Sequence, residues 1–223
     1  MNITPYLSTL QDSPLFQGLS AQEIASMVNC MSATVKEYDK NQYIHRMGNR
    51  ISSIGLVLFG NVHIVKEDFW GNRSIMAHIG PCELFGEAYA LTGTPLEVSV
   101  IAMEPVRVMF FNSGKIAQTC PTSCAFHTAL IRNLLKIITG KTLMLTQKIE
   151  HLSKRSTREK LLSYLSSQAL RSGNPNFEIP FNRTQLAEYL AIDRSAMTTE
   201  LGRMRDEGLL DFDKGRFELK QTI

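Results

Sequence analysis

Regularly spaced glycines limit the fold of this sequence more than any other feature. From residue 35 to residue 111 the chain consists of short apolar or alternating runs, a pattern typical of β-strands. The clearest runs span residues 54–59, 62–65, 74–79 and 106–111. Six of the seven glycines in this region follow one another at steps of 6 to 12 residues: Gly48, Gly60, Gly71, Gly80, Gly86 and Gly93. Because glycine permits tight turns between antiparallel strands, the region is predicted to be an all-β barrel or sandwich.

Apolar residues at helical spacing flank this β-region on both sides. Residues 10–31 are predicted to form one or two short helices, with Ser20 and Glu23 as a capping box. After Pro121 a heptad seam recurs at alternating steps of four and three residues: Ile131, Leu135, Ile138, Thr142, Leu145, Ile149 and Leu152. A second stripe runs beside the seam and consists of Leu130, Leu134, Ile137, Lys141 and Met144.

Because the helix has two apolar stripes, we expect each stripe to pack against a different surface. We expect the seam to be the dimer interface with a second copy of the chain. The second stripe would then cover the β-region and form the wall of whatever cavity it holds. The alternative is a helix buried in the core of a monomer.

The last third of the chain reads as a helix-turn-helix followed by a wing. A polar break at residues 153–157, with Ser156 and Glu159 as a capping box, predicts a hinge. After a helix to about residue 171 and a strand at 177–181, Asn182 caps a short helix and Asp193 caps the next. Strands at 209–213 and 216–219 flank Asp213-Lys214-Gly215, which is typical of a tight hairpin.

Composition and charge exclude several classes of protein. Of the 223 residues, 43% are hydrophobic and 20% charged, as in ordinary globular proteins. The net charge of +3 is too small to argue by itself for a nucleic-acid or membrane partner. No apolar run reaches the ~18 residues of a membrane span, and no signal peptide is apparent. We therefore expect a cytoplasmic protein without membrane contact.

In that compartment the four cysteines are expected to be thiols rather than disulfides. Cys120 and Cys124 are one helical turn apart, so a metal or redox pair is an alternative. The favoured interpretation is that they are small buried apolar residues.

The order of these elements, together with particular residues, resembles the CRP/FNR family of bacterial transcription regulators over nearly the whole chain. The β-region is similar to the glycine framework and phosphate cassette of the family's cyclic-nucleotide-binding roll. The matching residues are Gly48, Gly60-Asn-Val-His-Ile-Val, Gly71 and Phe85-Gly86-Glu87. The last third of the chain is similar to the family's winged helix-turn-helix. The matching segments are Asn182-Arg-Thr-Gln-Leu-Ala-Glu-Tyr-Leu, Asp193-Arg-Ser-Ala-Met and Leu201-Gly-Arg-Met-Arg-Asp-Glu-Gly-Leu-Leu. The second match is the more specific, because rolls also occur in kinases and channels.

The resemblance implies an α+β chain of three parts. Residues 1–120 would form an effector-sensing jelly roll, or double-stranded β-helix. Residues 121–153 would form a dimerisation helix, and residues 154–223 a winged helix-turn-helix that binds DNA.

The cassette of this chain departs from that of nucleotide-binding members of the family. In those members an Arg and then a Ser or Thr follow the Gly-Glu pair, and the Arg neutralises the cyclic phosphate. The family's spacing from Glu87 leads here to Glu97 and Val98, while Ser99 lies one residue further. A carboxylate repels a phosphate, and no Arg lies between Arg73 and Arg107. Cyclic AMP and cyclic GMP are therefore disfavoured as effectors.

Two other cofactor chemistries are also disfavoured. An iron–sulfur cluster would need three closely spaced cysteines near the N-terminus, where the sequence offers Cys30. A haem gas sensor would need an axial ligand, for which the candidates are His45, His63, His78, His127 and Cys82. We favour an unidentified small effector, such as an organic acid, an aromatic compound or a thiol reagent, bound between the roll and the long helix. Its candidate pocket residues are Gly86, Glu87, Tyr89, Glu97, Ser99, Lys141, Thr142 and Leu145. The alternative for Glu87 and Glu97 is a solvated surface position.

The helix that begins after Asp193 is the candidate DNA-reading helix. Such a helix lies in the major groove, where residues near its start reach base edges. The candidate base-reading residues are Arg194, Ser195, Thr198 and Thr199, and the candidate phosphate contacts are Arg183, Thr184, Arg203 and Lys214. Arg203 on a solvated helix face is the alternative.

The sequence thus predicts a homodimeric regulator that binds a palindromic operator in double-stranded DNA, with RNA polymerase as a further partner. A ligand-binding regulatory subunit of an enzyme or transporter is the alternative from another class, and a haem-based regulator is the alternative within the family. An enzyme is not expected, because no metalloprotease, P-loop or nucleophile-elbow motif appears.

Overall fold

The computed structural model describes residues 3–71, 73–117 and 125–220. They pack into two compact units, of which the first ends at Lys141 and the second begins at Thr142 and also includes Arg73–Ile75. The division therefore falls inside the long helix α5, Ala125–Ser153. The predicted limits of that helix were 121 and 153; α5 ends at Ser153, and residues 118–124 lie outside the described part of the chain. No helix of the described residues is long and apolar enough to cross a lipid bilayer.

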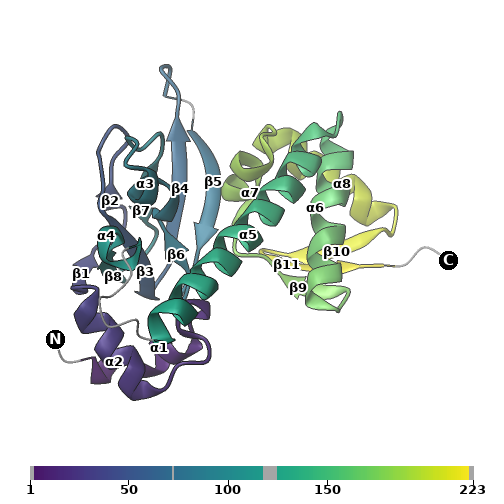
Figure 1. Ribbon diagram of the computed structural model, residues 1–223. Helices are drawn as coiled ribbons and strands as arrows, with labels where there is room; N and C mark the ends of the chain where they lie inside the picture. The colour runs from purple at the N-terminus through teal and green to yellow at the C-terminus, as the bar shows by residue number, and fades with distance from the viewer. Residues whose placement is uncertain (1–2, 72, 118–124, 221–223) are drawn as a thin grey trace. The chain divides into compact units, whose positions relative to one another are not determined.

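The first unit is a β-roll with helices at both ends of its sequence (Figure 1). The helices before the roll are η1 (Thr4–Tyr6), α1 (Leu7–Asp12), η2 (Pro14–Phe16) and α2 (Ala21–Cys30). The strands of the roll are β1 (Thr34–Tyr38), β2 (Tyr43–His45), β3 (Ser53–Phe59), β4 (Val62–Glu67), β5 (Arg73–Ile79), β6 (Leu84–Phe85), β7 (Ser99–Ala102) and β8 (Val106–Asn112). The first three residues of β5 are those assigned to the second unit. Two short helices, α3 (Glu87–Thr92) and α4 (Ser113–Ala117), follow β6 and β8.

Two four-stranded sheets make up the roll, in the orders β1-β8-β3-β6 and β2-β7-β4-β5. All four clear strand runs of the sequence fall within β3, β4, β5 and β8, which confirms the predicted β-region. The central strand β3 is covered on both faces, because Ile54 and Leu56 pack in one hydrophobic cluster and Val57 in another. A side chain at Gly55 would collide with the ring of Phe85, whose Cζ lies 2.3 Å from the position of the missing Cβ.

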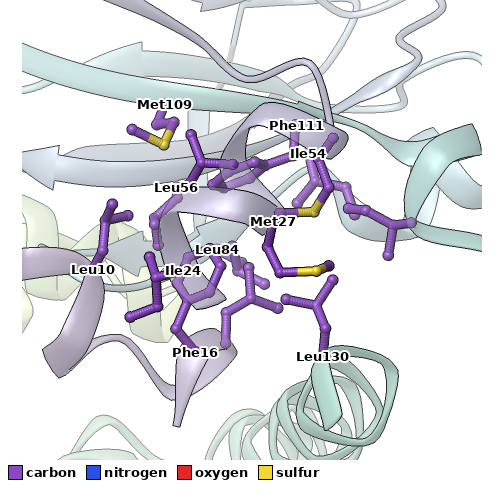
Figure 2. Close-up of a cluster of buried hydrophobic side chains, with 14 of the residues drawn as sticks. Leu10, Phe16, Ile24, Met27, Ile54, Leu56, Leu84, Met109, Phe111 and Leu130 are labelled. Carbon is purple, nitrogen blue, oxygen red and sulfur yellow. The ribbon is translucent and has the colours of Figure 1, made fainter. Parts of the chain in front are cut away.

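The larger cluster joins the N-terminal helices, one sheet and α5, as Figure 2 shows. Phe16 and Met27 come from the N-terminal helices, Ile54 and Phe111 from the strands, and Leu130 from α5. Leu130 and Leu134 are 0% and 5% exposed, and burial of each stabilises the fold by roughly 1.5–3 kcal/mol. The second stripe of the long helix therefore covers the roll, as predicted, over its first turns.

The second unit holds the rest of α5, three further helices and a three-stranded sheet ordered β10-β11-β9 (Figure 1). Its remaining elements are α6 (Thr157–Ser172), β9 (Asn176–Glu178), α7 (Arg183–Leu190), α8 (Arg194–Asp206), β10 (Leu210–Asp213) and β11 (Arg216–Leu219). The strand predicted at residues 177–181 is shorter and ends at Glu178. Ile179 still donates its amide to Gly215, but Pro180 has no amide hydrogen with which to continue the ladder.

Three predicted cap residues start helices as expected, and each forms a capping box. The Ser20 hydroxyl, the Ser156 hydroxyl and the Asn182 side chain each accept a hydrogen bond from the amide three residues on. The Glu or Gln at that third position accepts from the cap's own amide in return. Each cap is worth ~1 kcal/mol of helix stability, so these residues fix where α2, α6 and α7 begin.

In the second unit, the buried residue Lys148 of α5 contacts Tyr189 of α7. The Lys148 ammonium is 4.0 Å from the ring centre of Tyr189, and burial lowers the pKa of Lys148 to about 8. The charged form is therefore costly at this position, and its cation–π contact offsets only part of that cost.

Candidate nucleic-acid interface and ligand site

The pair α7 and α8 forms the predicted helix-turn-helix. Ala187 is 3% exposed and its carbonyl accepts the Ile192 amide at 3.0 Å, which closes the turn. Ala191 caps α7 at φ 49°, a left-handed conformation that a residue with a Cβ adopts only at some cost. The Asp193 carboxylate then accepts the Ala196 amide at 2.8 Å and starts α8.

The helix α8 has one buried face and one exposed face. Met197, Leu201 and Met204 recur at helical spacing and are at most 1% exposed. Leu186 and Leu190 of α7 are also fully buried, and because α7 packs against α8, these five side chains form a small core. Arg194, Ser195, Thr198 and Thr199 are all exposed. The four predicted base-reading residues thus lie on the part of α8 that the domain leaves open.

These four side chains differ in how freely they can reach a base. The Ser195 hydroxyl donates to the Asp193 carboxylate, and this bond together with the Ala196 amide lowers the pKa of Asp193. The Thr198 hydroxyl donates to the Arg194 carbonyl at 2.8 Å. Arg194 and Thr199 are exposed and make no such side-chain bond with the described residues, and the Arg194 guanidinium can bind guanine O6 and N7 together.

The four candidate phosphate contacts also differ in how accessible their side chains are. Thr184, Arg203 and Lys214 are exposed, and Arg203 lies 3.6 Å from the Glu200 carboxylate. Arg183 is different, because its guanidinium lies over the rings of Phe212 and Phe217, at 4.3 and 5.2 Å from their centres. Burial lowers the pKa of Arg183. This placement ties Arg183 to the wing sheet and makes it the least available of the four for a phosphate.

Sequence reasoning missed the ion pairs that hold α8 in place. Arg158 at the start of α6 pairs with Glu200 at 3.2 Å and with Glu207 just beyond α8. The two carboxylates raise the pKa of Arg158. Nothing in the local pattern marks these residues, since 42 and 49 positions separate the partners.

The heptad seam of α5 is largely uncovered in the single chain. Leu135, Leu145 and Ile149 are 60%, 52% and 67% exposed, and Thr142 is exposed as well. Ile131, Ile138 and Leu152 are partly buried, and Ile138 packs against the larger cluster of the roll.

In the roll, the structure brings two of the candidate pocket residues into direct contact. Gly86 at φ 78° turns the chain from β6 into α3 and places Glu87 as the first residue of the helix. The Glu87 side chain is 10% exposed, and its Oε1 lies 2.7 Å from the Lys141 Nζ. The same ammonium donates to the Leu84 carbonyl at 2.6 Å.

The remaining candidate pocket residues do not join this pair. Glu97 is 76% exposed at its side chain, 3.9 Å from Lys66, and so matches the solvated alternative. The Ser99 hydroxyl is buried and accepts the Met47 amide at 3.0 Å. Tyr89 is partly buried, and Thr142 and Leu145 are exposed residues of the second unit.

The candidate haem ligands are engaged in other contacts. His63 Nε2 and His78 Nδ1 lie 3.2 Å apart, and His127 is hydrogen-bonded to the Ile116 carbonyl at 3.1 Å. His45 packs edge-on to Phe85 and Phe110, and the Cys82 thiol donates to the Thr9 carbonyl. Cys120 and Cys124 lie outside the described residues. Within the described ranges no three His, Cys, Asp or Glu side chains are grouped as metal ligands.

Comparison with known proteins agrees with this two-part organisation. Residues 35–123 match the family model of the cyclic nucleotide-binding domain, and residues 159–222 match that of the Crp-like helix-turn-helix domain. Together the two matches cover more than half of the chain. The cyclic AMP receptor protein of Thermus thermophilus is 23% identical over 215 residues, which span 96% of this chain and 95% of that protein.

Solved structures share the fold at low sequence identity. A CooA variant from Carboxydothermus hydrogenoformans superposes with a TM-score of 0.73 at 15% identity, over 96% of this chain and 91% of that one. The c-di-GMP-responsive global regulator CLP of Xanthomonas campestris gives 0.71 at 16% identity, over 91% of this chain and 100% of that one. The same family is indicated by both domains, by their order and by the exposed face of α8. The chain belongs to the CRP/FNR family of DNA-binding transcription regulators, a family of regulators and not of enzymes.

Proposed function

We propose that this protein is a homodimeric cytoplasmic regulator that reads a palindromic operator through α8 and responds to a small effector of the roll. One observation carries the DNA-reading part of this proposal. The side chains of α8 that are free of the small core, Arg194 and Thr199 above all, lie at the start of the helix, where major-groove contacts are made.

The uncovered seam of α5 supports the homodimer. Large aliphatic side chains at seam positions are half to two-thirds exposed, and burying them against a second copy would remove that apolar surface from water. A two-fold dimer presents its reading helices to successive major grooves, so the operator should be an inverted repeat. The same proposal includes contact with RNA polymerase. It also includes a cytoplasmic location, because DNA and RNA polymerase are found there.

The chemistry of the roll argues against a cyclic nucleotide as the effector. Glu87 is already paired with Lys141, and the cassette position that would need a guanidinium carries the exposed Glu97. The relative from Thermus thermophilus is a cyclic AMP receptor by name, so calorimetric titration with cyclic AMP and cyclic GMP is the direct comparison. We expect no saturable binding, because a carboxylate repels the cyclic phosphate.

The experiment that tests the function is selection of bound sequences from random DNA, followed by affinity measurements with two matched variants. Arg194→Ala should remove sequence preference at one base pair of each half-site while leaving affinity for random DNA nearly unchanged. Arg203→Ala, on the same helix, should weaken both kinds of binding and lower the salt slope by about one. Selected sequences without two-fold symmetry, or an unchanged preference in Arg194→Ala, would refute α8 as the reading helix.

A further inference from the structure

Three hydrogen-bond acceptors converge where Lys141 enters the roll. The Leu84 carbonyl and Glu87 Oε1 accept from the Lys141 ammonium at 2.6 and 2.7 Å. The second carboxylate oxygen, Glu87 Oε2, is fully buried and has no hydrogen-bond partner among the described residues. A buried oxygen without a donor is costly, so this position has unused capacity for one more N–H or O–H group.

The fold holds each part of this arrangement in place. Leu84 and Phe85 form β6 and are at most 1% exposed, and the left-handed turn at Gly86 aims Glu87 back toward them. Lys141 continues the stripe of α5 that packs Leu130 and Leu134 into the roll. The ammonium therefore arrives from a helix that is itself fixed by packing.

The chemistry of this position selects cations. A carboxylate and a carbonyl are both acceptors, and the Lys141 charge is balanced by Glu87. An anion would meet the negative oxygens, whereas a primary ammonium, with three donors, could satisfy all three acceptors at once.

We propose that Leu84 and Glu87 form a cation site that the protein fills with its own Lys141, and that the effector class for this site is a small primary amine. In naming the effector class, this inference rests on the proposed function. An amine that displaces Lys141 would free α5 from the roll at the last residue of the first unit. Occupancy of the site is thereby linked to the position of the helix that carries the seam.

Chemical rescue tests the site without any need for DNA. Lys141→Ala removes the ammonium and leaves its position empty, which should lower the melting temperature of the full chain by about 5 °C. Propylammonium chloride should restore part of this loss, and tetramethylammonium chloride, which has no N–H donor, should not. Lys136→Ala on the exposed side of α5 is the matched control and should lose no stability and show no rescue.

The double variant Glu87→Gln/Lys141→Ala identifies the acceptor. It should show no specific rescue by propylammonium, because the amide carries no charge. A stable Lys141→Ala protein that does not respond to propylammonium would overturn the proposal, and so would equal rescue in the double variant.

A second measurement covers the case in which Lys141→Ala fails to fold. In the unaltered protein, pulse acetylation should modify Lys141 much more slowly than Lys136, because the Lys141 ammonium is held by two acceptors. Equal rates would overturn the proposal. Both assays are independent of operator binding, so a regulator that fails to bind DNA would refute the proposed function and leave the cation site standing.

Discussion

Placing charge on the seam of α5 should dissociate the proposed dimer without unfolding the chain. The double change Leu145→Lys/Ile149→Lys acts on two side chains that are 52% and 67% exposed, so the single chain loses little packing. Full burial of such a side chain is worth roughly 1.5–3 kcal/mol, and the exposed half to two-thirds is worth about 1–2 kcal/mol. A symmetric interface contains each residue twice, so four side chains contribute about 4–8 kcal/mol.

That free energy corresponds to a roughly 10³- to 10⁶-fold weaker dimer, before the repulsion between the new lysines is added. Sedimentation equilibrium over a range of concentrations measures the change, and far-UV circular dichroism checks that the helices persist. The chain offers a matched control in Leu143→Lys, because Leu143 is 63% exposed on the same helix but lies outside the seam. If the double variant remains a dimer, or if Leu143→Lys dissociates it equally, the heptad assignment is wrong.

Four further predictions follow from particular contacts. Arg194→Ala should cost about 1–3 kcal/mol of binding free energy per half-site on the operator, measured by fluorescence anisotropy against random DNA. Arg183→Ala should lower the free energy of unfolding by about 1 kcal/mol in urea, because its guanidinium lies over Phe212 and Phe217; an unchanged urea midpoint would refute this packing role. Ala191→Gly should raise stability by about 1 kcal/mol, since glycine adopts the left-handed turn without strain; thermal melting decides it. The pKa of Lys148 falls from 10.5 to about 8 on folding, so the unfolded chain binds more protons between those values, and stability should rise with pH from about 8 to 10. Lys148→Met should flatten this rise in pH-dependent urea titrations, and a curve of unchanged slope would show that another group causes it.

Local patterns predicted the parts of the fold that depend on neighbouring residues. Ser20, Ser156 and Asn182 cap helices because each is followed three residues later by Glu or Gln, and this reciprocal bond needs no tertiary context. The small core around Met197 and Leu201 was predictable for the same reason, since helical spacing alone places apolar residues on one face.

Contacts between distant residues could not be predicted in this way. Lys141 and Glu87 were both expected at the ligand site, but 54 positions separate them, and no periodicity shows that their charges neutralise each other. The phosphate contact of Arg183 stays a prediction, but its packing over Phe212 and Phe217 could not be predicted, because these two rings lie opposite each other only once β10 and β11 pair. The early end of the strand predicted at 177–181 was predictable from Pro180, which has no amide hydrogen for the ladder.

The close approach of Phe85 to Gly55 has a consequence for how related chains can diverge. The ring occupies the volume in which a side chain at position 55 would lie, so the two positions share one space inside the roll. A larger residue at 55 is tolerated only with a smaller one at 85, and position 85 immediately precedes the turn at Gly86 that aims Glu87. Positions 55 and 85 should therefore change together during evolution, and a chain that exchanges one alone would inherit a displaced turn at the ligand site.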